Sequence, residues 1–317
     1  MRIPISLIVD DGAPVNPAYW LHPEQRNVFL VPNDFTADFA AFCVEHGVRG
    51  KFSVLPMPSG LGPIDQRLNY VPQRHLAGFL DLMQRRIAPL FDITPELLTH
   101  QMTVNLKTGG LLHLYEDEWV ARASVEEITD YIAHALRILK NVGLPANGVT
   151  SPWSTGRHNE RVYAEAIGRA QWRVHRRKRT WYFLHTKASG PPQRPAVTWR
   201  DRKTGQQVAS VFALTGDPFW NTQHQSSRRA ALDVALKGVD ALLSPDGRSG
   251  RVRELFDAGG PIVLLTHWQS LFSNDVRAGL AGFKELVRRI EAVFGDQVEW
   301  VTCSKLARQD GSAREEA

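Results

Sequence analysis

The sequence contains little cysteine and no long hydrophobic run, and each absence excludes a class of protein. Its two cysteines, Cys43 and Cys303, lie far apart and form no CxxC pair, which excludes a disulfide framework and a cysteine-based zinc finger. No apolar stretch approaches the ~18 residues of a membrane span, and the N-terminus lacks the basic and apolar regions of a signal peptide. We therefore expect a soluble protein of the cytoplasm with no membrane partner.

Charge of either sign is not in great excess. The chain has 38 Lys and Arg against 33 Asp and Glu, a formal net charge of +5. The most concentrated basic run is RVHRRKR at residues 173–179, which has the charge to hold an anionic ligand or nucleic acid. Because no recognised nucleic-acid-binding motif accompanies it, we interpret the run as a solvated loop or helix end and expect no nucleic-acid partner.

Strand and helix signals alternate along the chain. Apolar, β-branched runs at residues 3–9 and 261–267 predict buried strands. Ser124 and Glu127 form the S-x-x-E pattern of a capping box, which predicts a helix from there to about Asn141. Repeated strand-helix units of this kind favour an α/β fold, in which a parallel sheet is closed or nearly closed into a barrel.

The most informative residues stand where apolar strands end. Asp10 and Asp11 end the first strand, His100 follows the third, residues 150–153 follow a fourth, and His267 ends the sixth. Right-handed crossovers would bring these strand ends to one face of the barrel. Two carboxylates and two imidazoles there suit a divalent metal with a general base and a general acid. Taken singly, an Asp-Gly pair also suits a turn, and a lone histidine is more often simply hydrogen-bonded.

At these positions the sequence resembles the polysaccharide deacetylase family, also called the NodB-homology proteins or carbohydrate esterase family 4. Four short segments carry the resemblance in the family's order, at residues 8–11 (IVDD), 96–104 (ELLTHQMTV), 150–153 (TSPW) and 265–267 (LTH). The resemblance implies that Asp10 is the catalytic base, that His267 is the general acid, and that Asp11 and His100 are metal ligands. Residues 217–220 (DPFW) hint at a further family motif that contains Asp and Trp.

The resemblance also implies a fold and an activity. The fold would be a single distorted (β/α)7-8 barrel of the polysaccharide deacetylase and glycoside hydrolase type over residues 1–308, and the polar residues 309–317 are expected to form a disordered tail. The activity would be metal-dependent hydrolysis of an amide or ester bond in a carbohydrate or a related small molecule. Zinc is the expected metal, although carboxylate and imidazole ligands also suit nickel, cobalt, iron and manganese.

One departure from the family pattern affects the metal site. Val104 stands where the family has a second histidine ligand. Three outcomes follow from the loss of that ligand. Asn105 or His113 supplies the missing contact, His267 turns inward as a ligand, or the site holds no metal.

A second departure affects the catalytic base. Thr150 replaces the family's arginine, which would orient Asp10 through an ion pair. Without that arginine, Asp10 is expected to be held less firmly, unless a nearby cation such as Arg157 takes its place.

Aromatic residues near the strand ends bear on the substrate. Trp153, Trp220 and Trp268, together with Pro152, are predicted to bind a carbohydrate, because aromatic rings stack on the apolar faces of sugars. The same rings also occur at protein interfaces, so the aromatic excess leaves room for a homodimer.

Two alternatives to the hydrolase remain open from the sequence. The first is a catalytically impaired, carbohydrate-binding pseudoenzyme on the same barrel, which Val104 and Thr150 favour. The second is a glycoside hydrolase that pairs Asp10 or Asp11 with Glu116 or Glu118. A retaining pair of carboxyl groups must lie ~5 Å apart and an inverting pair ~6.5–9.5 Å apart.

Overall fold

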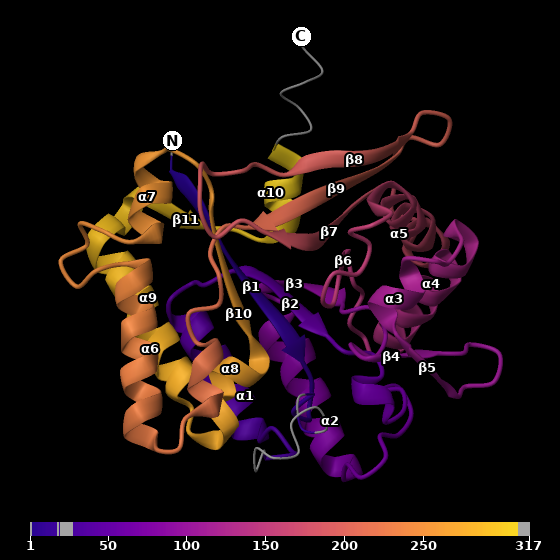
Figure 1. Ribbon diagram of the computed structural model, residues 1–317, viewed down its shortest axis with the longest axis horizontal. Helices are drawn as coiled ribbons and strands as arrows, with labels where there is room; N and C mark the ends of the chain where they lie inside the picture. Colours follow the sequence, from indigo (N-terminus) through magenta and orange to yellow (C-terminus); the bar gives the residue numbers. More distant parts are fainter. Residues whose placement is uncertain (1, 18, 20–27, 310–317) are drawn as a thin grey trace.

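Parallel strands form the centre of the structure, a computed structural model that describes residues 2–17, 19 and 28–309 (Figure 1). The larger sheet has the strand order β10 (Ile262–His267), β1 (Ile3–Gly12), β2 (Gly50–Val54) and β3 (Phe91–Pro95), and β11 (Val298–Trp300) pairs with the start of β1. All of these pairings are parallel. Strand β1 is buried along most of its length because it has a hydrogen-bonded neighbour on both sides.

A second sheet adjoins the first. Its strand order is β6 (Gly148–Thr150), β7 (Arg179–Thr186), β9 (Gln206–Ala213) and β8 (Ala196–Asp201). The first three strands are parallel, whereas β8 and β9 form an antiparallel hairpin. A third, two-stranded sheet consists of β4 (Met102–Val104) and β5 (Leu111–Tyr115). The sequence-based prediction of an α/β fold with a parallel sheet is therefore confirmed.

Contacts join the two larger sheets at both margins. Glu96, which follows β3, forms a parallel bridge with Thr150 at the end of β6. On the other margin, the Leu214 N–H donates to the carbonyl of Val263 in β10 at 2.8 Å. The first contact brings the carboxyl ends of β3 and β6 together, and the second joins the end of β9 to the start of β10.

Helices flank the strands, with α6, α7 and α9 on one side of the view in Figure 1 and α3, α4 and α5 on the other. The longer helices are α1 (Asn33–Glu45), α2 (Gln73–Leu82), α4 (Val125–Asn141), α5 (Glu160–His175), α6 (Arg228–Leu242) and α9 (Ala278–Phe294). The shorter helices are α3 (Glu116–Val120), α7 (Arg251–Asp257), α8 (Trp268–Phe272) and α10 (Cys303–Gln309). Five single turns complete the set, a π-helical turn at Met83–Ile87 and 3₁₀ turns at Pro58–Gly60, Trp220–His224, Ser273–Asp275 and Gly295–Gln297.

Helix α4 begins and ends as its sequence predicts. The Ser124 side chain accepts from the Glu127 N–H, and the Glu127 carboxylate accepts from the Ser124 N–H, which completes the predicted capping box. Its apolar face, including Ile128, Ile132 and Leu136, is buried against the core. Burial of such a stripe, more than helix propensity, stabilises a helix of this length.

Two further predictions concern a membrane span and the C-terminal tail. No described helix is both long and apolar enough to cross a membrane. Of the tail predicted to be disordered, Gln309 is the last residue of α10, and residues 310–317 lie outside the described residues.

Aromatic rings fill the core between the larger sheet and helices α1 and α8. Trp268 is 0% exposed, and its ring centroid lies 4.6 Å from that of Phe35 and 5.0 Å from that of Phe52. It also meets Phe39 edge-on at 5.4 Å. The prediction that Trp268 binds a carbohydrate is therefore inconsistent with its position, because a fully buried ring has no face free to stack on a sugar.

Candidate active site

The predicted strand-end residues lie together in one cavity. Asp10 and Asp11 belong to the last residues of β1, and His267 is the last residue of β10. The cavity has a volume of about 190 Å³, and its lining consists of Asp10, Asp11, Glu96, His100, Ser151, Trp153, Phe183, Leu184, Thr186, Trp220, Leu265 and His267. The strand crossovers therefore gather acids and imidazoles at the carboxyl ends of the strands, where α/β folds commonly build their sites.

A local distortion of β1 sets the direction of Asp11. Its φ of 64° is left-handed, and the pairing of β1 with β2 shifts register between Val9 and Gly12. The next residue must be glycine, because a Cβ on Gly12 would lie 2.2 Å from both the Phe52 ring and the Ser53 carbonyl oxygen. A non-glycine residue with positive φ is sparsely populated, and such residues cluster at functional sites.

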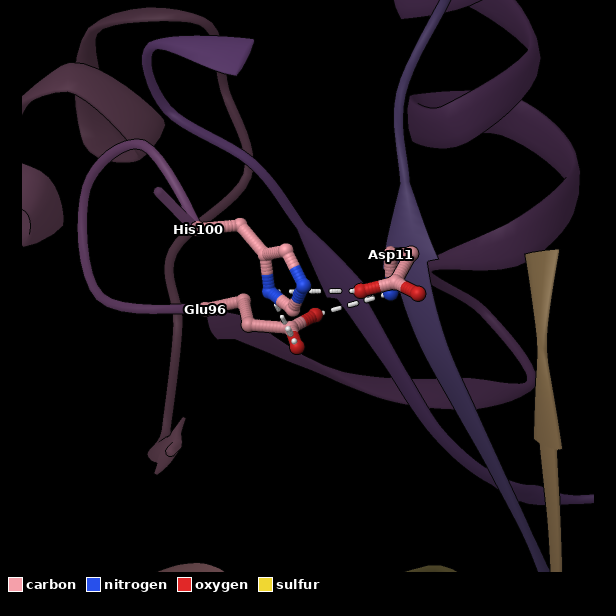
Figure 2. Close-up of side chains that lie close together, drawn as sticks. All are labelled: Asp11, Glu96 and His100. Carbon is pink, nitrogen blue, oxygen red and sulfur yellow. Dashed lines mark hydrogen bonds and ion pairs between the residues drawn. The ribbon is translucent and has the colours of Figure 1, made fainter. Parts of the chain in front are cut away.

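Asp11, Glu96 and His100 converge to form a compact cluster (Figure 2). One ligand atom from each residue lies within 4.8 Å of the other two. His100 Nδ1 is 3.0 Å from Glu96 Oε1 and 3.4 Å from Asp11 Oδ1. Apart from these ion pairs, Asp11 Oδ1 and His100 Nδ1 have no hydrogen-bond partner in the described part of the chain, and both are buried. Buried ligand atoms that face one another in this way fit a site for a cation.

Backbone and side-chain donors fix the two carboxylates. Glu96 Oε2 accepts from the Asp11 N–H at 2.7 Å and from the Ser53 hydroxyl at 2.6 Å. The Gln269 side-chain amide donates to the other oxygen of Asp11, Oδ2. Each carboxylate therefore has one oxygen held by the protein and one oxygen that faces His100.

Glu116 holds the loop that carries His100. This carboxylate is fully buried and accepts from the backbone N–H groups of Leu98 at 3.1 Å, Thr99 at 2.9 Å and His100 at 3.0 Å. The Tyr131 hydroxyl donates to it at 2.7 Å. Neither Glu116 nor Glu118 lines the cavity, so the structure gives no support to the glycoside hydrolase alternative.

Mutual interaction sets the ionisation of the cluster. Burial lowers the pKa of His100, but the charges of Asp11 and Glu96 outweigh this effect and raise the pKa to about 10. Burial alone would raise the pKa of Glu96, yet the His100 imidazolium brings it below its usual range. Burial raises the pKa of Asp11 to about 6, against the opposing effect of His100. The proton on His100 therefore lies between two carboxylates, at the position that a cation would take.

Asp10 forms an ion pair with Lys51, which sequence reasoning missed. Lys51 lies on β2, is 0% exposed and donates to Asp10 Oδ1 and, at 2.7 Å, to the Thr150 hydroxyl. Its Nζ also lies 5.2 Å from the centroid of the Phe183 ring. Burial raises the pKa of Asp10, and the Lys51 ammonium opposes that shift. Lys51, and not Arg157, is therefore the cation that contacts Asp10.

His267 is paired with Asp217. His267 Nδ1 lies 2.8 Å from Asp217 Oδ2, which also accepts from the His267 N–H at 3.1 Å and from the Ser270 hydroxyl at 2.7 Å. Burial lowers the pKa of His267, but the hydrogen bond to Asp217 and nearby carboxylates raise it to about 9. The Trp220 ring meets the imidazole edge-on at 4.8 Å. His267 Nδ1 is thus engaged with Asp217, and His267 is not one of the three residues of the cluster.

The other predicted residues fall into two groups. Trp153 and Trp220 line the cavity and are 55% and 39% exposed, whereas Pro152 is buried behind them. Trp153 stacks on His100 with centroids 5.5 Å apart, and its indole N–H donates to the His100 carbonyl at 3.0 Å.

Neither predicted substitute ligand is part of the cluster. Asn105 Oδ1 accepts from the backbone N–H groups of Lys107 and Thr108 and so closes the turn between β4 and β5. His113 lies on β5, and Val104, where a second histidine was expected, is buried in β4. The third cluster member is Glu96, whose sequence signal is the same as that of Asp10 and Asp11: a carboxylate that follows an apolar strand.

Comparisons with known proteins give only remote structural likeness. No family model and no curated protein matches the chain. Among solved structures, a mutant of BA3943, described as a CE4 family pseudoenzyme with restored enzymatic activity, is 9% identical, with a TM-score of 0.43, over 97% of this chain and 68% of that chain. A second BA3943 mutant, described as a CE4 family pseudoenzyme, gives the same values.

An exo-β-1,4-mannosidase, Op5Man5 from Opitutaceae bacterium strain TAV5, is 11% identical, with a TM-score of 0.40, over 91% of this chain and 59% of that chain. Likeness at this level assigns no activity, which must be inferred from the geometry of the site itself.

Proposed function

We propose that this protein is a metal-dependent hydrolase of the polysaccharide deacetylase type, acting on an amide or ester bond of a carbohydrate or a related small molecule. Its scaffold would be a distorted (β/α) barrel, closed by the contacts that join Glu96 to Thr150 and Leu214 to Val263. The main support is the cluster of Asp11, Glu96 and His100, which shares a cavity with Asp10 and His267.

Asp11, Glu96 and His100 would hold the metal. Two carboxylates and one imidazole suit zinc, and equally manganese, iron or cobalt. Glu96 then takes the place of the histidine missing at Val104, and it makes the ligand set more negative by one charge. A divalent cation bound there would supply polarisation of the scissile carbonyl and activation of water.

Asp10 is suited to act as the general base. It lines the same cavity as the cluster, and the Lys51 ammonium fixes one of its oxygens. An opposite charge favours the ionised carboxylate, which is the form that accepts a proton. The second oxygen of Asp10 would take the proton of the attacking water.

His267 is suited to act as the general acid. With a pKa raised to about 9, its imidazolium keeps its proton at neutral pH. Asp217 accepts the hydrogen bond from Nδ1 and fixes the ring, so Nε2 would protonate the leaving nitrogen or oxygen. Trp153 and Trp220, exposed at the rim, would stack on a sugar ring.

Release of product from a panel of N- and O-acetylated sugars tests this proposal. We expect Asp10→Asn and His267→Ala each to lower kcat/KM by about 10²-fold or more, since each loses one acid–base group. Asp233→Asn, a change at an exposed position of α6, is the matched control and should retain full activity. Equal rates for Asp10→Asn and the control would refute the assignment.

The second candidate is a carbohydrate-binding pseudoenzyme, which the missing imidazole at Val104 favours. In that case Trp153 and Trp220 would bind sugar without turnover. Saturable sugar binding by metal-loaded protein, with no product over the whole panel, would support the pseudoenzyme over the hydrolase.

A further inference from the structure

A second and larger cavity lies at the opposite ends of the strands. Its volume is about 360 Å³, within the range typical of small-molecule sites. The lining consists of Asn147, Arg177, Arg179, Thr180, Trp181, Gln207, Ala209, Ser304, Ala307 and Arg308. These residues come from the starts of β7 and β9, the residue before β6, and helix α10, which lies close to β7 and β9 (Figure 1).

The charge of this cavity is entirely positive. Three arginines line it, Arg177, Arg179 and Arg308, and none of the lining residues is acidic. In the described part of the chain, Arg177 and Arg179 form no ion pair, and Arg308 donates only to the carbonyl and hydroxyl oxygens of Ser304, at 3.2 and 3.3 Å. Two of these arginines belong to the basic run at residues 173–179 that the deacetylase-like chemistry does not use.

Asp92, an acid that contacts two of the lining residues, is already engaged. Asp92 accepts from the Ser304 N–H at 2.6 Å, from the Ser304 hydroxyl at 3.0 Å and from the Asn147 side-chain amide at 2.6 Å. It therefore holds two lining residues in place, and the three guanidinium groups have no anionic partner in the described part of the chain.

The wall of the cavity also carries polar atoms with unmet hydrogen bonds. Trp181 is 2% exposed, and its indole Nε1–H has no partner among the described residues. The Asn147 side-chain oxygen is likewise buried and unpartnered in the described part of the chain. A buried indole N–H usually finds an acceptor, and an oxygen-rich ligand would supply one. The Asn147 oxygen instead needs a donor, such as a hydroxyl group of the ligand.

We propose that this cavity binds a phosphate-bearing small molecule. Guanidinium groups form paired hydrogen bonds with phosphate oxygens, and arginine is the residue most suited to planar, bidentate recognition of that group. The site is separate from the candidate active site, although β7 contributes to both: Trp181 lines the basic cavity, and Phe183, two residues further along, lines the other. The proposed phosphate site is therefore independent of the substrate site proposed above.

Calorimetric titration of the purified protein with inorganic phosphate, pyrophosphate and glucose 6-phosphate tests the proposal. We expect saturable binding of at least one probe, weakened about tenfold or more in the double variant Arg179→Gln/Arg308→Gln. The control is Arg67→Gln/Arg86→Gln, which removes the same charge at exposed positions outside the cavity. All four positions are exposed, and unchanged circular dichroism would show that both variants fold.

The three probes separate the sources of the phosphate group. Tighter binding of glucose 6-phosphate indicates a phosphate ester, whereas tighter binding of inorganic phosphate or pyrophosphate indicates a free anion, and either result supports the proposal. Three results would overturn it: no binding to the wild type, equal weakening in both double variants, or binding only of a short oligonucleotide. The last would mean that the basic run is a nucleic-acid surface.

Discussion

The charged side chains at the two ends of the parallel strands differ in burial and in pairing. At the carboxyl ends, ionised side chains are buried against one another: Asp10 against Lys51, His267 against Asp217, and His100 between two carboxylates. At the amino ends, the arginines of the basic cavity are exposed and contact no acid among the residues that the structure describes.

The side chains at the two ends are therefore held in place by different means. Internal pairing at the carboxyl ends fixes the side chains before any ligand arrives. Burial and neighbouring charges shift the pKa of Asp10, His100 and His267 there, which is the condition for acid–base chemistry. At the amino ends, the positive charge of the arginines would instead be balanced by an anion from solution. Removal of one charged side chain at either end tests this contrast.

The largest effect is expected for Lys51→Met. Removal of the ammonium leaves the buried Asp10 carboxylate without its partner, and breaking a buried ion pair in this way costs about 3–5 kcal/mol in the free energy of unfolding. Arg179→Gln, the comparison at the other end, should cost less than about 0.5 kcal/mol, since an exposed, unpaired arginine loses little. Urea denaturation measures both.

A double variant checks the cause of the Lys51 effect. Lys51→Met/Asp10→Asn removes both charges and should recover part of the lost stability. If the double variant is as unstable as the sum of the single changes, the two side chains do not act as a pair.

A smaller effect is expected for Glu116→Gln. The variant keeps one carbonyl oxygen but loses an acceptor for the backbone N–H groups that position His100, so metal affinity should fall by about 10–100-fold with the fold retained. Competition with a colorimetric chelator measures the affinity. Glu118→Gln, in an exposed capping box of α3, is the control, and equal losses in the two variants would contradict a positioning role for Glu116.

The smallest effect concerns pH. The pKa of His267 is raised from 6.5 to about 9 in the folded protein, and the hydrogen bond to Asp217 is the leading cause of the rise. A raised pKa stabilises the fold fully below pH 6.5, and this contribution is lost as the pH rises through about 9. Asp217→Asn should therefore lower the free energy of unfolding on the order of 1 kcal/mol near pH 6 and by less near pH 10. A deficit that does not change with pH would exclude this linkage.

Local signals were sufficient to predict much of the scaffold. The capping box at Ser124 and the apolar run at residues 261–267 correspond to helix α4 and strand β10, because both signals act over a short stretch of the chain. Strand ends were also recognisable, since an apolar run that stops at polar residues marks the point where a buried strand reaches the surface.

Contacts between distant segments were not predictable in the same way. Lys51 looks like an ordinary strand residue, and only the folded sheet shows that its side chain reaches Asp10. Glu96 was read as part of a motif whose second ligand should lie at Val104, although its own strand-end position carried the signal. Trp268 follows a strand end as Trp153 does, but the chain turns into α8 there and directs the ring into the core. The end of a strand can be predicted from the sequence, whereas the direction of the side chain that follows depends on tertiary packing.

The metal content of the purified protein tests the central claim most directly. Elemental mass spectrometry after incubation with zinc, cobalt or manganese and dialysis should find close to one metal per chain in the wild type and in Glu118→Gln. Glu96→Gln and His100→Ala should lose it, because each removes one of three ligands. No metal in the wild type, or full retention in Glu96→Gln, would contradict a metal centre formed by Asp11, Glu96 and His100.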